Sequence, residues 1–156
     1  MLVLKNIETL EEAQVLRNIR NECKDFMTRD TSYISVEQQI RWFNSLKRDD
    51  KKDYKIYLLY EVINGVVATA IGYGLIRKEG SFSLISGGLI ESCRGKGYGS
   101  TLFTYLIGNV DAGSDIKLEV LKSNTRAFVI YNKLGFRVIS DDGEIITMEY
   151  HYDSQI

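Results

Sequence analysis

The most informative segment of the chain is Leu89-Ile-Glu-Ser-Cys-Arg-Gly-Lys-Gly-Tyr-Gly-Ser100. An apolar strand pattern ends at its start, three glycines then alternate over five residues, and a helical pattern begins at Tyr98. Glycine lets successive backbone N–H groups turn toward one point without interference from a Cβ atom, and a helix N-terminus adds partial positive charge there. The segment therefore predicts a loop that binds an anion such as pyrophosphate, although glycine spacing alone is equally compatible with a plain turn.

Two common phosphate-binding motifs are absent. The Walker motif requires Gly-x4-Gly-Lys-Ser/Thr, and no such run occurs in the chain. The dinucleotide fingerprint Gly-x-Gly-x-x-Gly fails because the third residue after Gly99 is Leu102. What remains is Arg94-Gly-Lys-Gly-Tyr-Gly99, an Arg/Gln-x-x-Gly-x-Gly/Ala signature. It resembles the pyrophosphate loop of the GNAT superfamily of acyl-CoA-dependent N-acetyltransferases.

A second motif supports this resemblance at the distance that the family requires. The run from Leu118 to Phe136 resembles the family's strand-helix-strand segment, and the match covers Glu119, Asn124, Ala127, Tyr131 and Leu134-Gly-Phe136. The chain departs from the family at one place, because members often carry proline three residues before the motif arginine and this chain has Glu91. The resemblance extends over essentially all 156 residues.

Hydrophobic periodicity and turn residues predict the elements from the residues themselves. Capping-box patterns at Thr9-Leu-Glu-Glu12 and Ser35-Val-Glu-Gln38 indicate two helix starts, and residues 47–53 are expected to form a charged turn. Strands are expected at 2–4, 54–62, 66–77, 81–90, 116–121, 136–139 and 144–152, and helices at 10–22, 36–46, 98–110 and 125–134. This order predicts one α/β domain over residues 1–156, and the resemblance implies the GNAT fold, a mixed central β-sheet of about seven strands flanked by about four helices.

Composition limits the class of protein. Hydrophobic residues make up 44% and charged residues 26%, which is typical of a folded globular domain. The net charge of −1 makes nucleic acid an unexpected partner. No apolar run has the length of a membrane-spanning helix and no signal-peptide pattern is present, so we expect no membrane partner and a cytoplasmic location. Cys23, Cys93 and His151 are too few for a disulfide framework or an ordinary zinc site, so we expect no metal.

The resemblance implies acetyl-CoA as the co-substrate. In the GNAT fold the strand that ends near Ile90 and the strand 116–121 splay apart, and a pantetheine arm can pair there like an added strand. The residues implied to contact the cofactor are Leu89, Ile90, Arg94, Gly95, Lys96, Gly97, Tyr98, Gly99, Ser100, Asn124 and Tyr131. For Asn124, capping of the following helix is an equally good explanation from the residues alone.

Acyl transfer to an amine requires a neutral amine and a stabilised thiolate leaving group. An amine with a pKa near 10.4 costs about 4–5 kcal/mol to deprotonate at pH 7, so a general base is useful. The resemblance implies that Tyr131 is the general acid, and a role as a core aromatic is its alternative. Glu119 is a candidate base, as in some protein N-terminal acetyltransferases of the family, and Glu91 or a bound water is the rival base.

The acceptor is the least determined part of the site. In the GNAT fold the first two helices and their loop wall the acceptor side, so the candidate substrate contacts are Phe26, Met27, Arg29 and Tyr33. The segments 16–27 and 34–42 resemble the N-terminal half of amino-sugar-nucleotide and ribosomal-protein acetyltransferases of the family. A small amine such as an amino sugar is therefore the favoured acceptor, and a protein N-terminus is second. A CoA-binding sensor without turnover and a homodimer are kept open.

Overall fold

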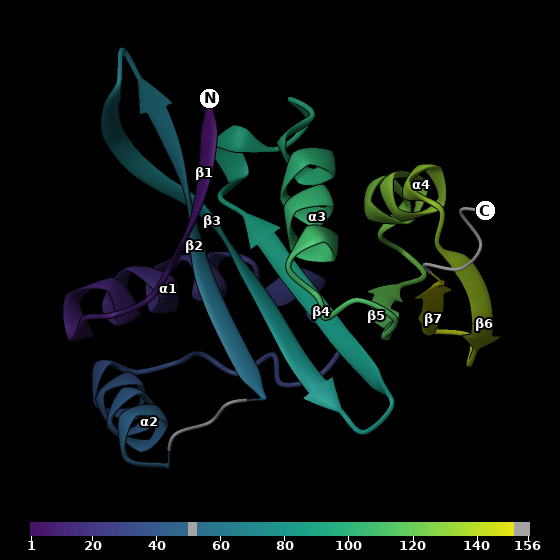
Figure 1. Cartoon of the computed structure of the whole chain (residues 1–156), viewed down its shortest axis with the longest axis horizontal. Coiled ribbons are helices and arrows are strands. Elements are labelled where there is room, and N and C mark those ends of the chain that lie inside the picture. The colour runs from purple at the N-terminus through teal and green to yellow at the C-terminus, as the bar shows by residue number, and fades with distance from the viewer. Residues whose placement is uncertain (50–52, 152–156) are drawn as a thin grey trace.

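The computed structural model describes residues 1–49 and 53–151, with the side chains of 47–49 and 68 left aside. The strands are β1 Leu2–Asn6, β2 Tyr54–Ile63, β3 Val66–Glu79, β4 Phe82–Leu89, β5 Asp115–Leu121, β6 Arg137–Asp141 and β7 Ile145–Tyr150. The α-helices are α1 Leu10–Glu22, α2 Val36–Asp49, α3 Tyr98–Gly108 and α4 Thr125–Leu134, and short 3₁₀-helices lie at Lys24–Phe26 and Glu91–Cys93. The predicted α/β class and order of elements are confirmed (Figure 1).

The described strands form one seven-stranded sheet in the order β1-β2-β3-β4-β5-β7-β6. Two clusters of buried residues cover its two faces, because successive side chains of a strand point to opposite sides. The larger cluster contains Leu102 and Leu106 of α3 and Tyr131 of α4, and the smaller contains Leu16 and Ile19 of α1. The sheet is thus packed between α1 on one face and α3 with α4 on the other.

Both predicted capping boxes are present. Thr9 Oγ1 accepts a hydrogen bond from the Glu12 N–H at 3.1 Å, and Glu12 Oε1 accepts one from the Thr9 N–H at 3.0 Å. Ser35 and Gln38 repeat the arrangement at 3.1 and 2.8 Å at the start of α2. These reciprocal bonds satisfy backbone donors that the first helical turn leaves free, so local sequence is sufficient to define both helix starts.

The end of α2 differs from the prediction. The helix continues through Asp49, so the charged turn expected from residue 47 does not begin there. Lysine and arginine are good helix formers, and residues 47–49 contain no glycine or proline to stop the helix. Residues 50–52 of the expected turn, and Tyr152 of the expected last strand, lie outside the described residues.

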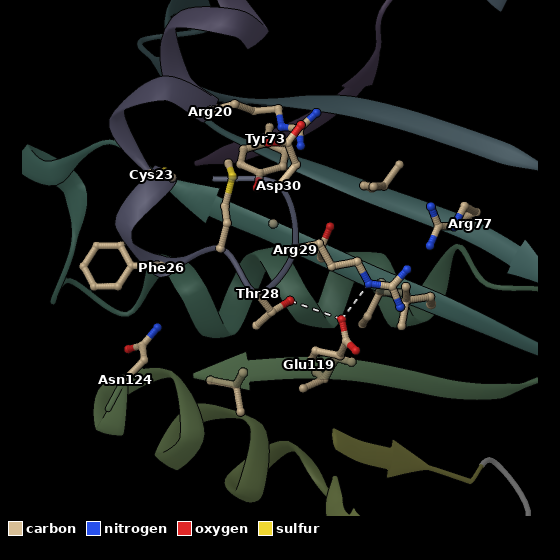
Figure 2. A pocket seen from close by; sticks show the side chains of 18 of the residues that line it. Arg20, Cys23, Phe26, Thr28, Arg29, Asp30, Tyr73, Arg77, Glu119 and Asn124 are labelled. Carbon is tan, nitrogen blue, oxygen red and sulfur yellow. Dashed lines mark hydrogen bonds and ion pairs between the residues drawn. The ribbon is translucent and has the colours of Figure 1, made fainter. Parts of the chain in front are cut away.

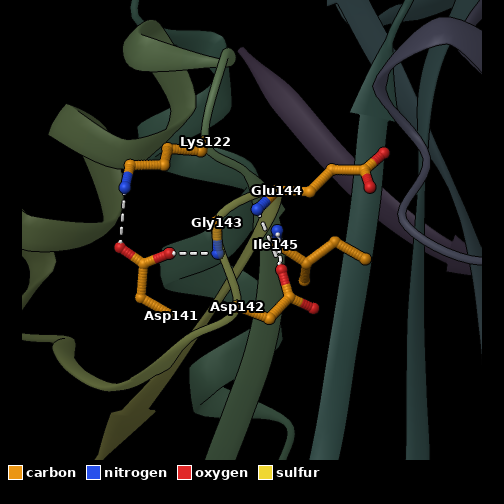
Figure 3. A network of polar contacts seen from close by, with 6 residues as sticks. All are labelled: Lys122, Asp141, Asp142, Gly143, Glu144 and Ile145. Atoms are coloured by element: carbon orange, nitrogen blue, oxygen red, sulfur yellow. Dashed lines mark hydrogen bonds and ion pairs between the residues drawn. The ribbon is translucent and has the colours of Figure 1, made fainter.

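Glycine, asparagine and aspartate form the hairpin turns. Asn64 and Gly65 have φ values of 52° and 77°, as a tight two-residue hairpin requires, and this confirms the hairpin predicted from Asn-Gly. In the β6–β7 turn, one oxygen of Asp141 accepts the Gly143 N–H at 2.9 Å and the other bonds Lys122 Nζ at 3.0 Å (Figure 3). The lysine follows β5 directly, so this contact also ties the turn to β5.

The feature of the fold that creates a site is the separation of β4 and β5. These parallel strands pair over only three residues each, Phe82–Leu84 with 115–117. Beyond these residues β4 continues to Leu89 and β5 continues to Leu121, but the two strands no longer pair with each other. The predicted splay is therefore present, and it leaves main-chain groups of both strands without sheet partners at their carboxyl ends.

Candidate active site

Two cavities meet at the gap between β4 and β5. The first cavity, of about 290 Å³, is lined by the end of α1, residues 26–30 and parts of β2, β3, β4 and β5. The second cavity, of about 540 Å³, is lined by the end of β4, the starts of α3 and α4 and the segment before α4. The residues that line both are Cys23, Phe26, Gly87, Asn124 and Tyr131. A molecule in one cavity can therefore reach a molecule in the other across the gap.

The predicted anion loop lies at the start of α3. Gly95 and Gly97 have φ values of 78° and 83°, a left-handed conformation that glycine adopts without strain. Gly97 is the N-cap residue of α3, and no side chain caps this helix, in contrast to α1 and α2. The first N–H groups of α3 are thus available to an anion, with the positive end of the helix dipole behind them.

Two arginines near the loop have different surroundings. An ideal Cβ atom on Gly95 would lie 3.6 Å from Arg126 Nη1, so Arg126 of α4 adds positive charge beside the loop. No sequence motif marks Arg126, because only the packing of α4 beside α3 brings it there. Arg94 Nε instead donates to Leu89 O at 3.0 Å, and its guanidinium lies 4.9 Å from the centre of the Phe26 ring. Arg94 therefore holds the end of β4 against the segment after α1, while Lys96 is exposed to solvent.

The main chain of β4 presents groups to the gap. The Ile90 N–H donates to Ile71 O at 2.9 Å, and Ile90 O accepts the Cys93 N–H at 3.0 Å. Because the groups of successive residues in an antiparallel ladder point to opposite sides, the N–H groups of Leu89 and Gly87 face away from β3 and into the gap. Leu89 can therefore supply the main-chain contact expected of it. Ile90 cannot, because both of its polar main-chain groups are already bonded. Gly87 is a further residue with its N–H in the gap, and the sequence did not reveal it.

Asn124 and Cys23 both lie where the two cavities meet. Asn124 Oδ1 accepts the Ala127 N–H at 3.3 Å, so the capping role considered for this residue is present. Its amide group also lines both cavities. Cys23 Sγ donates to Leu89 O at 3.3 Å, and burial raises the pKa of its thiol. Cys23 and Cys93 are both buried free thiols.

Tyr131 of α4 occupies the junction of the cavities. Its side chain is 8% exposed, and its ring packs edge-on against Phe103 with ring centres 4.8 Å apart. Burial raises the pKa of the phenol well above its ordinary value, so the hydroxyl keeps its proton at neutral pH. No side chain or main-chain group of the described residues forms a hydrogen bond with this hydroxyl. It is therefore both packed in the core and free to donate a proton at the gap.

Glu119 lies across the first cavity from α1 (Figure 2). Its neighbours Leu118 and Val120 are buried toward α3 and α4, so strand alternation directs Glu119 to the opposite face. Glu119 Oε1 accepts hydrogen bonds from Thr28 Oγ1 at 3.1 Å and from Arg29 Nε at 2.8 Å. The hydrogen bond that Arg29 donates to Glu119 raises the pKa of the Arg29 guanidinium. Glu119 also lines the first cavity, so its carboxylate is within reach of a molecule bound there.

The other predicted site residues separate into two groups. Phe26, Met27 and Arg29 line the first cavity, as expected for acceptor contacts. Tyr33 lines neither cavity; it is 63% exposed, and its hydroxyl accepts a hydrogen bond from Arg17 at 3.2 Å. Glu91 lines the second cavity only, on the side of the anion loop. Glu119 is thus the candidate base that shares a cavity with the expected acceptor contacts.

Several polar residues of the first cavity were not identified from the sequence. They come from three separate elements and are Arg20, Tyr54, Tyr73 and Arg77. Burial raises the pKa of Tyr73 to about 12, so this phenol also stays neutral. No local motif marks these residues, since each belongs to an ordinary helix or strand pattern and only the sheet register brings them together.

One cluster outside the cavities contains metal-ligating residue types. Asp115, Glu149 and His151 offer ligand atoms within 4.8 Å of one another. The two ring nitrogens of His151 lie 2.9 Å from a carboxylate oxygen of Asp115 and of Glu149. These side chains therefore already partner one another, and the expectation of no metal stays a prediction. None of the helices in the described ranges combines the length and the apolar composition needed to cross a bilayer.

Comparison with protein families identifies the class. The family model for FR47-like protein matches residues 67–145, which run from β3 to the first residue of β7 and include both motifs and the strand gap. The chain belongs to the FR47-like family, and its fold is that of the GNAT superfamily of N-acetyltransferases. No curated protein matches the chain at a significant level.

Solved structures share this fold over nearly the whole chain. A GNAT superfamily phosphinothricin acetyltransferase from Sinorhizobium meliloti, in complex with acetyl-CoA, is 16% identical with a TM-score of 0.73, covering 96% of this chain and 88% of that chain. The Campylobacter jejuni N-acetyltransferase PseH, in complex with acetyl coenzyme A, is 18% identical with a TM-score of 0.71, covering 97% and 99%. A ribosomal-protein-alanine N-acetyltransferase from Brucella melitensis is 16% identical with a TM-score of 0.69, covering 96% and 99%.

Proposed function

We propose that the protein transfers the acetyl group of acetyl-CoA to a primary amine by direct attack of the amine on the thioester. The observation that carries this proposal is the meeting of the two cavities at the gap between β4 and β5. A cofactor arm in the second cavity and an amine in the first would come together beside Tyr131. Two structural neighbours are complexes with acetyl-CoA, which supports the same co-substrate here.

The cofactor side of the site fits a CoA thioester. When bound, acetyl-CoA supplies an acetyl carbon that is activated for attack. The uncapped N–H groups at the start of α3 bind the pyrophosphate, and Arg126 and Lys96 add positive charge. The Leu89 N–H pairs with the pantetheine arm as a strand neighbour would. The Gly87 N–H, which faces the gap at the junction, stabilises negative charge on the thioester oxygen.

We assign Tyr131 as the general acid that protonates the leaving thiolate. A phenol whose pKa is raised by burial keeps its proton through the neutral range. Its hydroxyl has no competing hydrogen bond among the described residues, so it can donate that proton at the gap. The acid role and the core-packing role are compatible, because the ring packs on Phe103 while the hydroxyl lies at the cavity junction.

We assign Glu119 as the general base that takes a proton from the acceptor ammonium. Its Oε1 accepts hydrogen bonds from Thr28 and Arg29, and the residue lines the first cavity. A carboxylate in this position binds the ammonium and takes its proton, directly or through a water. Glu91 lies on the cofactor side of the gap, so it is the less suitable base.

The favoured acceptor is a small amine such as an amino sugar. The first cavity measures about 290 Å³, at the lower end of the range for small-molecule sites. A protein N-terminus would need room for the following residues as well. Tyr131 and Glu119 both line this cavity, which argues against a sensor that binds CoA without turnover.

Release of free CoA thiol from acetyl-CoA tests the proposed function. The protein is expected to release thiol in the presence of small primary amines, and the panel should include amino sugars, amino acids and peptides that begin with alanine or serine. Activity confined to the peptides would replace the favoured acceptor with a protein N-terminus. Acetyl-CoA binding without thiol release for any amine would favour the sensor.

Replacement of Glu119 by glutamine tests the base. The Glu119→Gln variant is expected to be slow near pH 7, and the deficit should shrink as the pH approaches the pKa of the amine, because the amine then loses its proton without help. The measurement is kcat/KM of both proteins between pH 7 and pH 10.

Arg29→Gln is the matched control for this experiment, since it removes the same ion pair but keeps the carboxylate. The arginine side chain is 56% exposed, so a loss of less than about 1 kcal/mol in stability is expected. Its pH profile should follow wild type. A rate for Glu119→Gln that equals wild type at every pH would remove Glu119 from the mechanism.

A further inference from the structure

The wall of the first cavity away from the gap carries two arginines on neighbouring elements. Arg20 lies in the last turn of α1, and its guanidinium is 5.9 Å from the centre of the Tyr73 ring. Arg77 lies near the end of β3, on the same strand face as Tyr73, and its direct partner on β2 is Tyr54. Arg20, Tyr54 and Arg77 all line the first cavity and none of them lines the second.

Both arginines have an unsatisfied donor. The guanidinium of Arg20 bonds the Tyr73 hydroxyl, but Arg20 Nε and Arg77 Nε are buried and neither atom has a hydrogen-bond partner among the described residues. Arg77 also pairs through Nη2 with Glu79 at 2.6 Å, which leaves its Nε unbonded. Buried donors of charged groups are nearly always bonded, because leaving one without a partner is costly. An anionic ligand at this cavity wall would supply acceptors to guanidinium groups that the described residues leave incompletely bonded.

Two guanidinium groups act on one phenol at this wall. Burial is the main cause that raises the pKa of Tyr54, and the charges of both Arg20 and Arg77 oppose it, so both guanidinium groups act on the same phenol. Glu119 pairs with Arg29 and Glu79 pairs with Arg77, so two of the three arginines of the cavity already have a carboxylate partner. Asp30 also lines the cavity, and its carboxylate accepts the Ser32 N–H at 2.9 Å.

Arg20 and Glu119 lie on different sides of the first cavity, whereas Asp30 lies on the side of Arg20 and Arg29 on the side of Glu119. Figure 2 shows Arg20 and Tyr73 on one side and Glu119 of β5 across from them. An acceptor with an anionic group at the arginine wall would extend its amine toward Glu119 and the gap. A ligand with only an amine would leave the two buried Nε donors unbonded.

We infer that the acceptor amine carries a carboxylate or phosphate group, which Arg20 and Arg77 bind while the amine lies at Glu119. This inference rests on the proposed function and narrows it. Among amino sugars it selects phosphorylated or nucleotide-linked forms over neutral ones, and it adds amino acids as acceptors. Guanidinium groups suit both anions, since their parallel N–H donors match two oxygen atoms.

Matched ligand pairs test the inference without requiring turnover. Binding is measured by thermal shift in the presence of saturating free CoA, so that a phosphate probe cannot occupy the anion loop. One arm compares glucosamine 6-phosphate with glucosamine, and the other compares amino acids with their carboxamides. The anionic member of at least one arm is expected to bind at least about 10-fold more tightly, as one charged hydrogen bond at a buried site contributes.

Three variants assign the preference to the arginine wall. Arg20→Gln and Arg77→Gln are each expected to lower the affinity for the anionic ligand by about 10-fold or more and to leave that for its neutral partner unchanged. Arg137→Gln, an exposed change of equal charge on β6, should leave both affinities unchanged. If a glutamine variant fails to fold, the lysine variant at the same position should give an intermediate loss, because it keeps the charge and loses the paired donors.

Two results would overturn the inference. The first is equal binding of the charged and neutral members in both arms. The second is a preference for the anionic ligand that remains unchanged in both the Arg20→Gln and the Arg77→Gln variant. Neither result bears on the proposed function, which fails instead if free CoA does not stabilise the wild-type protein. The ligand pairs can then still be compared without CoA, since the arginine wall belongs to the first cavity alone.

Discussion

The Gly97→Leu variant is expected to lose the stabilisation that acetyl-CoA gives to the wild-type protein. At 100 times its dissociation constant, a ligand that binds only the folded state raises the free energy of unfolding by about 2.7 kcal/mol. A leucine side chain at the N-cap of α3 would project from the anion loop, where a Cβ atom now meets nothing within 4 Å. It would occupy the space of the pyrophosphate, so thermal melts with and without acetyl-CoA should coincide for the variant.

Gly113→Leu is the matched control. Gly113 has a φ of 82°, against 83° for Gly97, and a Cβ atom there also meets nothing within 4 Å. Both variants therefore carry the same backbone strain and lose similar intrinsic stability, but Gly113 lies in the turn before β5 and lines neither cavity. Gly113→Leu should keep the full ligand-dependent shift. A shift of wild-type size in Gly97→Leu would contradict the assigned loop, and no shift in the wild-type protein at millimolar acetyl-CoA would contradict the proposed co-substrate.

The Tyr131→Phe variant is expected to lose about 10²-fold in kcat, the usual contribution of one proton transfer. The substitution keeps the ring that packs on Phe103 and removes only the hydroxyl, which has no hydrogen bond within the described part of the chain. Stability and the shift caused by acetyl-CoA should therefore remain close to wild type. The measurement is steady-state thiol release with an acceptor identified from the amine panel.

Tyr105→Phe gives the contrasting result. The Tyr105 hydroxyl donates to Leu2 O at 3.3 Å, and the residue lines neither cavity. This variant should lose about 1 kcal/mol of stability with its hydrogen bond and keep the wild-type kcat. If Tyr131→Phe turns over as fast as wild type, Tyr131 is a packing residue and the thiolate takes its proton from another source.

Local sequence was sufficient for the elements and the anion loop. A capping box depends on residues three apart, and a hairpin depends on an Asn-Gly pair, so Thr9, Ser35 and Asn64 define their elements without help from the rest of the chain. The loop at Gly95 and Gly97 belongs to the same category, because its N–H groups and the helix that follows are contiguous in sequence. The end of α2 was mispredicted because the charged residues 47–49 suggested a turn, although they include good helix formers and no residue that stops a helix.

The acceptor side was decided by tertiary structure. Arg20, Tyr54 and Arg77 come from α1, β2 and β3, and the register of the sheet with the packing of α1 is what places them in one cavity. Likewise, the ion pair between Glu119 and Arg29 joins residues 90 positions apart. The local sequence pattern predicts which face of its helix or strand a residue occupies, but it does not predict which residues of other elements lie opposite that face. The charge that an acceptor would meet is therefore a property of the assembled sheet, whereas the loop that we propose binds the cofactor phosphates is a property of a few consecutive residues.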